Sequence, residues 1–102
     1  MAKTSEPELG RAVMRFLATR PDYQATMRVL IKRVPGHITL TPEDLEPSGK
    51  RPGEAMWEQR VRNLKSHDTT EGNVLAEGYV DRPKRGHYRL TKAGLAHLKI
   101  AP

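Results

Sequence analysis

The chain has 102 residues, of which 36% are hydrophobic, and a mean hydropathy of −0.70, so it predicts one modest core and a single domain over residues 1–102. Its 18 Lys and Arg residues against 12 Asp and Glu residues give a net charge of +6, which favours a polyanionic partner such as nucleic acid. The lack of cysteine excludes disulfides, Cys-ligated zinc and thiol catalysis, and no apolar run approaches the ~20 residues of a membrane span. With no leader pattern at its start, we expect a soluble, cytoplasmic, nucleoid-associated protein with no membrane role.

The first predicted element is a helix that follows a flexible lead over residues 1–5. Ser5 and Glu8 fit a capping box at its start. Apolar side chains then recur with helical spacing at Leu9, Val13, Phe16 and Leu17. The helix is expected to end near Thr19, because Pro21 pushes the residue before it out of the α region.

A second helix, a short strand and a capped turn are expected next. Asp22 is the predicted N-cap of the helix, and Pro35 and Gly36 stop it. Its buried stripe is predicted to be Tyr23, Met27, Leu30, Ile31 and Val34. Off the stripe lie Arg28, Lys32 and Arg33, interpreted as a solvated face, with contact to a DNA backbone as the alternative. Residues 37–40 predict a strand that pairs later with a hairpin, and residues 41–45 predict a capped helical turn before a loop.

The helix that begins at Glu54 has two chemically different faces. At 100° per residue, one narrow stripe collects Trp57, Val61 and Leu64, which we expect to be buried. The opposite side collects Ala55, Gln59, Arg62, Asn63 and Ser66. Arg can donate in pairs to guanine, and Gln and Asn can pair with adenine, in the major groove. Arg60 and Lys65 flank the stripe, and the stretch from Gln59 to His67 contains no acid, so it is a predicted recognition helix; an ordinary surface helix of mixed charge is the alternative.

A basic hairpin follows over residues 79–90. Its strands alternate as half-buried strands do, and residues 83–86, Pro-Lys-Arg-Gly, have the composition of a hairpin tip. The side chains expected in the core are Val80, Tyr88 and Leu90. Those expected to face out are Arg82, Lys84, Arg85 and His87. Four cations between Arg82 and Arg89, with no acid among them, favour phosphate contact; protection of a sheet edge is the alternative. Thr91 is the expected cap of a last helix, with Leu95, Leu98 and Ile100 packing back.

The predicted order of elements (helix, helix, strand, helix, hairpin, helix) matches a winged helix-turn-helix. This is an α+β fold with three to five helices and a small antiparallel β-hairpin wing. Residues 86–95, GHYRLTKAGL, resemble the G-x-Y-x-L-T-x-x-G segment that closes the wing in many bacterial winged-helix modules. Over residues 20–98 the chain also resembles winged-helix domains attached to restriction endonucleases, of the Mrr N-terminal type and those preceding HNH nucleases. The residues that carry this second resemblance are Arg60 to Leu64, Ser66-His67, Gly72-Asn73 and Glu77 to Tyr79.

This resemblance implies a DNA-reading module of a restriction or defence system. In such nucleases the winged helix reads double-stranded DNA and a separate segment cuts it, and the chain contains neither a D…E-x-K constellation nor an HNH core. The implied partners are double-stranded DNA and a separate nuclease or defence protein. Some relatives recognise modified bases, which makes Trp57, Tyr79 and Tyr88 candidate contacts for a methyl group. The hydrophobic pattern instead favours a core position for Trp57 and Tyr88.

The candidate DNA-binding residues are Gln59, Arg60, Arg62, Asn63, Lys65, Ser66, His67, Arg82, Lys84, Arg85 and His87. Two other functions remain open: a transcriptional regulator, and a winged helix that binds proteins and not DNA. The histidines lack the spacing of a metal site, so we expect no catalytic residue, metal or cofactor. The target sequence, the reading of a modified base and the oligomeric state stay open at this point.

Overall fold

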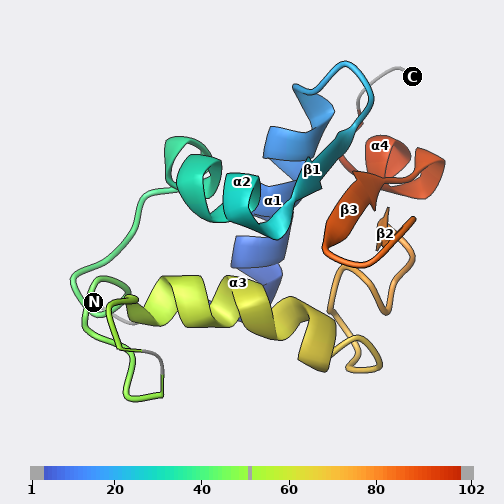
Figure 1. Ribbon diagram of the computed structural model, residues 1–102. Coiled ribbons are helices and arrows are strands. Elements are labelled where there is room, and N and C mark those ends of the chain that lie inside the picture. Colours follow the sequence, from blue (N-terminus) through green and yellow to red (C-terminus); the bar gives the residue numbers. More distant parts are fainter. Residues whose placement is uncertain (1–3, 51, 100–102) are drawn as a thin grey trace.

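The computed structural model describes residues 4–50 and 52–99 (Figure 1). Its elements, in chain order, are α1 (Glu6–Ala18), β1 (Gln24–Thr26), α2 (Met27–Arg33), the 3-10 helix η1 (Val34–His37), α3 (Met56–Ser66), β2 (Val80–Asp81), β3 (His87–Leu90) and α4 (Lys92–His97). Helices and a small antiparallel sheet of order β1-β3-β2 give an α+β fold compatible with a winged helix, as predicted. Within the described ranges no helix is long and apolar enough to cross a membrane.

The first helix, α1, is the central element and contacts α2, η1, α3 and β3. Its predicted capping box is confirmed, because Ser5 Oγ accepts from the Glu8 N–H at 3.3 Å and a Glu8 carboxylate oxygen lies 3.4 Å from the Ser5 nitrogen. The helix buries both Leu9 and Leu17 completely. Thr4, at the end of the expected flexible lead, is itself buried, whereas residues 1–3 lie outside the described part.

The strand predicted at residues 37–40 is wrong. The strand that pairs with β3 is β1, which precedes α2; Gln24 lies opposite Arg89 and Thr26 opposite His87. His37 is instead the last residue of η1, and residues 38–40 form no strand. The pairing joins residues more than 60 positions apart, so no local pattern in the sequence reveals it.

The predicted N-cap at Asp22 is also wrong. Tyr23 has a φ of 58°, a left-handed conformation that turns the chain into β1. Asp22 accepts from the Gln24 N–H at 3.2 Å and so closes a turn. The N-cap of α2 is Thr26, whose hydroxyl accepts from the Val29 N–H at 3.3 Å. The α-helix ends at Arg33, but Pro35 does not end the helical structure, because it falls in the first turn of η1.

The connection between η1 and α3 is fastened by Asp44. The predicted capped turn is confirmed, since Thr41 Oγ1 accepts from the Asp44 N–H at 3.2 Å. The buried Asp44 carboxylate accepts from Thr4 N at 2.7 Å, Thr4 Oγ1 at 2.5 Å and Thr41 N at 2.9 Å. Burial disfavours its charged form, but these hydrogen bonds outweigh burial and lower the pKa of Asp44. The Asp44 carbonyl accepts from the Trp57 N–H at 3.0 Å, so one residue ties the start of α1 to the start of α3.

The other end of α3 is held by Asn73, which is almost fully buried. Its amide nitrogen donates to the Leu64 carbonyl at 3.0 Å, near the end of α3, and to a Glu6 carboxylate oxygen at 3.3 Å. Its side-chain oxygen accepts from the Leu75 N–H at 2.8 Å and the Ala76 N–H at 3.3 Å. The Gly72-Asn73 pair of the motif therefore has a structural role, because Asn73 satisfies a carbonyl that the helix leaves open.

The last helix begins at the predicted cap and packs back on the core. Thr91 Oγ1 accepts from the Gly94 N–H at 3.0 Å, and Leu95 is buried, while Leu98 is half-buried and Ile100 lies outside the described residues. A Cβ at Gly94 would lie 2.3 Å from the Tyr79 carbonyl oxygen, which explains why glycine ends the L-T-x-x-G pattern.

Candidate nucleic-acid interface

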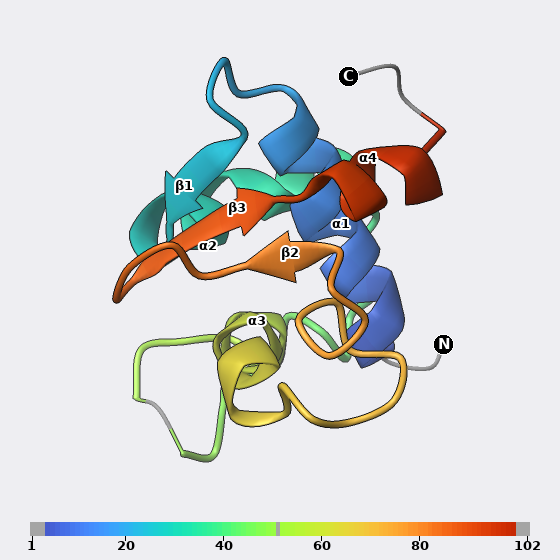
Figure 2. The same cartoon turned by 90° about the vertical axis from the view of Figure 1, so that its right-hand side faces the viewer.

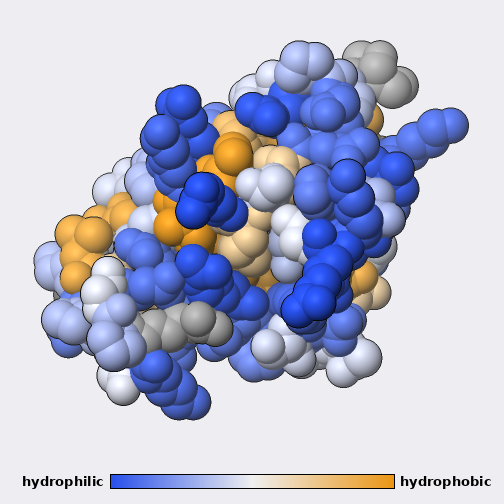
Figure 3. All heavy atoms as spheres, viewed as in Figure 1, coloured by the Kyte–Doolittle hydropathy of each residue, from blue (hydrophilic) through white to orange (hydrophobic). Residues whose placement is uncertain are grey.

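The recognition helix predicted from the sequence and the hairpin tip lie on one side of the molecule. In Figure 1 the turn between β2 and β3 lies next to α3, and the view of Figure 2 shows the same tip reaching outward beside that helix. Hydrophilic side chains cover most of this side, and apolar atoms show around its centre and at its left edge (Figure 3). This arrangement is the one expected of a winged helix, in which a helix and a hairpin meet the ligand together.

The two-faced character of α3 is confirmed. Trp57, Val61 and Leu64 are 5%, 0% and 3% exposed, so the predicted stripe is buried. On the opposite side Gln59, Arg62 and Asn63 are partly exposed and Ser66 is exposed, as is Lys65 beside them. The Gln59 side-chain oxygen accepts from the Ser48 hydroxyl, so the loop before α3 is held against this face.

Arg62, the predicted guanine reader, is bound to an acid in the structure. Its Nε donates to the two Glu54 carboxylate oxygens at 2.9 and 3.2 Å, and its Nη2 lies 2.9 Å from one of them. In this geometry one guanidinium group donates to both oxygens of a carboxylate. The O6 and N7 atoms of guanine would need the same donors, so Glu54 occupies the group that would read a base.

Arg60 and His67 were predicted to be at the interface but lie on the side of α3 that faces α1. Arg60 Nη1 donates to the Thr4 carbonyl at 2.8 Å, and its Nε is buried without a hydrogen-bond partner in the described part of the chain. His67 Nδ1 lies 2.6 Å from a Glu6 carboxylate oxygen. The structure does not bring either side chain to the face of Gln59 and Arg62, because both fasten α3 to the start of α1.

In the hairpin, Lys84 and Arg85 face solvent at the tip, as predicted. Arg82 is half-buried and lies over the Tyr88 ring at 5.9 Å. The Nδ1 atom of His87 lies 3.1 Å from the Arg85 carbonyl.

Arg89, the fourth cation counted in the hairpin, is paired. Its Nε and Nη2 donate to the Asp81 carboxylate at 3.0 and 2.8 Å. The hydrogen bond from Asp81 and the charge of Asp81 raise the pKa of Arg89. The sequence shows no acid between Arg82 and Arg89, but strand pairing brings Asp81 opposite Arg89. The hairpin cations without an ion pair in the described residues are therefore Arg82, Lys84 and Arg85, of which Lys84 and Arg85 are exposed.

The aromatic residues are not available as a cage for a methyl group. Trp57 and Tyr88 are each 5% exposed, which confirms the core position that the hydrophobic pattern favours. Burial raises the pKa of Tyr88, and the nearby charges of Arg82 and Arg62 oppose this shift. Tyr79 stacks on His97 of α4 with ring centroids 4.2 Å apart. Within residues 4–50 and 52–99 no group of three His, Asp or Glu side chains could hold a metal ion.

One comparison identifies the family. The family model described as the Mrr N-terminal domain matches residues 7–99. The chain belongs to the Mrr N-terminal domain family. This family is the N-terminal domain of Mrr restriction-system proteins, which confirms the resemblance found in the motifs and extends it to α1. No curated protein and no solved structure gives a significant match to the chain.

Proposed function

We propose that this Mrr N-terminal domain binds double-stranded DNA as the reading module of a restriction system. The observation that carries the proposal is that the polar face of α3, with Gln59, Arg62 and Asn63, and the cationic tip of the hairpin share one side of the molecule. An α-helix fits the major groove, and cations beside it can bind the adjacent phosphates. Separate parts of the domain would then supply specificity and affinity.

In this proposal the side chains of α3 read the bases. Arg62 and Asn63 are the leading readers, and Gln59 and Ser66 assist them. Lys65 at the edge of the face binds a phosphate. Arg62 exchanges the Glu54 carboxylate for the edge of a guanine, whose O6 and N7 atoms accept from the same pair of donors.

The hairpin supplies the sequence-independent part of the affinity. Lys84 and Arg85 at the tip bind the DNA backbone or enter the adjacent minor groove. Arg82 and His87 lie closer to the sheet and contact the backbone from the base of the hairpin. Because these contacts release counterions, the affinity should fall steeply as the salt concentration rises.

Selection from a random duplex library tests the proposal, run in parallel on unmodified DNA and on DNA methylated at adenine or cytosine. We expect an enriched motif of a few base pairs that contains guanine, the base that Arg62 pairs with best. If the module reads a modified base, only the methylated library yields the motif. If no duplex binds at micromolar protein and low salt, the result contradicts the proposal and favours a protein partner for this face.

A further inference from the structure

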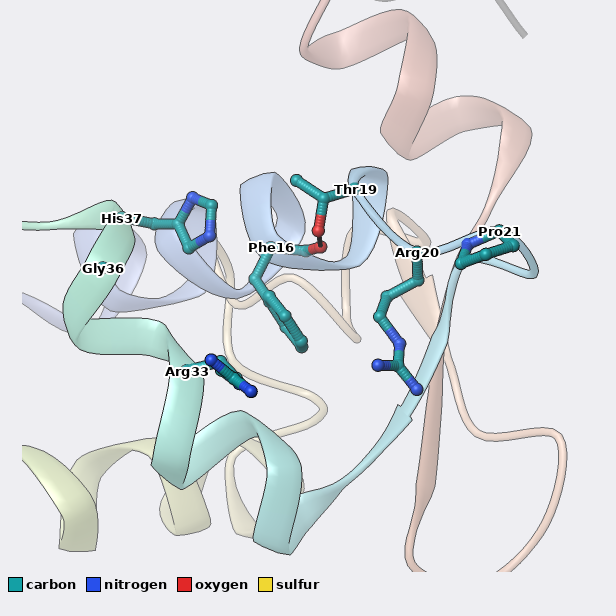
Figure 4. A pocket seen from close by; sticks show the side chains of 7 residues that line it. All are labelled: Phe16, Thr19, Arg20, Pro21, Arg33, Gly36 and His37. Atoms are coloured by element: carbon teal, nitrogen blue, oxygen red, sulfur yellow. Dashed lines mark hydrogen bonds between the residues drawn. The ribbon is translucent and has the colours of Figure 1, made fainter.

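A second basic site lies away from α3, in a hollow of about 410 Å³ between the end of α1 and the helices α2 and η1 (Figure 4). The residues that line it are Phe16, Thr19, Arg20, Pro21, Arg33, Gly36 and His37. The end of α1 and η1 lie across the molecule from α3, with α2 between them (Figure 1). The residues proposed to read DNA therefore do not line this hollow.

The side chains that line the hollow include hydrogen-bond donors and no carboxylate. In Figure 4 the side chains of Arg20, Arg33 and His37 surround the ring of Phe16. The Arg20 guanidinium is held in place, because its Nε donates to the Gln24 carbonyl at 3.0 Å and its carbon lies 5.8 Å from the centre of the Phe16 ring. The His37 ring lies 5.8 Å from the same ring.

The two arginines keep their charge uncompensated. Neither Arg20 nor Arg33 forms an ion pair with a carboxylate in residues 4–50 and 52–99, whereas Arg62 and Arg89 both do. Arg33 is exposed at the rim, and no acid lines the hollow. Two guanidinium groups on either side of the Phe16 ring, at a concave surface, suit the oxygens of a phosphate, which arginine binds in pairs.

We propose that this hollow is a second anion site, in which Arg20 and Arg33 bind a phosphate group and His37 donates a further hydrogen bond. Phosphate could reach it from two sources. A neighbouring hollow of about 220 Å³ shares Arg20 and extends to His87 of the hairpin, so DNA bound at the hairpin could continue into the site. A free phosphorylated ligand could also enter from solvent. Asp22 lines the neighbouring hollow and bonds to the Gln24 N–H of its own turn.

Titration of the full chain with inorganic pyrophosphate, followed by NMR of the arginine Nε–H groups, tests the site itself. We expect shifts at Arg20 and Arg33, and a loss of binding by tenfold or more in the double variant Arg20→Gln, Arg33→Gln. The control is the double variant Lys92→Gln, Lys99→Gln, which removes the same charge from exposed positions that do not line the hollow. This control should bind pyrophosphate like the unchanged chain.

Duplex DNA in a second arm identifies the source of the phosphate. If DNA supplies it, the slope of log affinity against log salt falls by about 0.9 in the Arg20→Gln, Arg33→Gln variant relative to the control, since the variant loses one phosphate contact. If a free ligand supplies it, the slope is unchanged and pyrophosphate binding is lost. The proposal is overturned if the variant and the control behave alike in both arms.

Because Arg20 also contacts Gln24 and Phe16, its replacement could disturb the fold. The single variant Arg33→Gln avoids this, since the Arg33 side chain is exposed and, unlike that of Arg20, makes no hydrogen bond within the described residues. It should keep the melting temperature of the unchanged chain and still weaken pyrophosphate binding several-fold. If DNA supplies the phosphate, this variant should lower the salt slope by up to about 0.9, the value for one phosphate contact. The pyrophosphate arm does not depend on α3, so a failure of the proposed DNA binding would leave it intact.

Discussion

At the scale of single residues, ion pairs with carboxylates determine which cationic side chains remain available to bind DNA. Glu54 holds Arg62, Asp81 holds Arg89 and Glu6 holds His67. Two of these pairs fasten elements to each other, and the Glu54 pair instead covers a group that we propose reads DNA. Glu6 and His67 are remote in the sequence and meet only in the fold. The other two pairs each span eight residues, and the first turns of α3 or the pairing of β2 with β3 bring them together.

Replacement of Arg62 by alanine should relax the preference at one base position by about 1–3 kcal/mol.

Glu54→Gln should instead raise the affinity several-fold and sharpen that preference, because the competing carboxylate is gone. Glu58→Gln removes the same charge from the first turn of α3 and should raise the affinity without a change in base preference. Selection on a duplex library measures all three. A uniform weakening by Arg62→Ala across all sequences would make Arg62 a phosphate contact.

The buried Asp44 predicts a dependence of stability on acid. Its folded pKa lies below the unfolded value of about 3.9, so its contribution is complete above that value and is lost as the pH falls through the lower folded pKa. Asp44→Asn should lower the free energy of unfolding by about 2–3 kcal/mol at neutral pH, because an amide group would face donors that need an acceptor.

Urea unfolding between pH 2 and pH 7 measures this contribution. The loss of stability on acidification should be smaller in Asp44→Asn than in the unchanged chain. Asp68→Asn serves as the control, because Asp68 is exposed beyond the end of α3 and should leave both stability and its pH dependence unaltered. Equal acid dependence in Asp44→Asn and the unchanged chain would rule out the role of Asp44.

At the scale of elements, the parts with strong local signals were predictable. The capping box at Ser5, the stripe of Trp57, Val61 and Leu64, and the cap at Thr91 are all confirmed, because each depends on residues within about two helical turns. β1 was missed, since three residues form a strand only when β3 lies beside them. The partners of Arg60 could not be found for the same reason, as Thr4 is remote in sequence.

The close approach of α4 to the sheet predicts a large effect at Gly94. A Cβ there would lie 2.3 Å from the Tyr79 carbonyl oxygen and 2.5 Å from Leu90 Cδ1, so backbone must move. Gly94→Ala should lower the free energy of unfolding by about 1–3 kcal/mol. Gly49→Ala is the matched control, because a Cβ at Gly49 meets nothing within 4 Å. Chemical denaturation compares the two, and similar stabilities would contradict the packing of α4 described above.

At the scale of the whole molecule, the net charge of +6 is spread unevenly. The hairpin tip and the hollow at Arg20 and Arg33 carry cations without acids, whereas α3 and the paired strands of the hairpin carry ion pairs. α3 is fixed at both ends, by Asp44 at its start and Asn73 at its end. A rigid helix beside a solvent-facing cationic tip supports a division between base reading and phosphate binding.

The most direct test of this division is the salt dependence of duplex binding. The measurement compares the unchanged chain with Lys84→Gln, Arg85→Gln and with the charge-matched control Lys92→Gln, Lys99→Gln. We predict that loss of the two tip cations lowers the slope of log affinity against log salt by about 1.8, while the control changes it little and the preferred sequence stays the same. An unchanged slope in the tip variant would contradict the assignment of the hairpin to the DNA backbone.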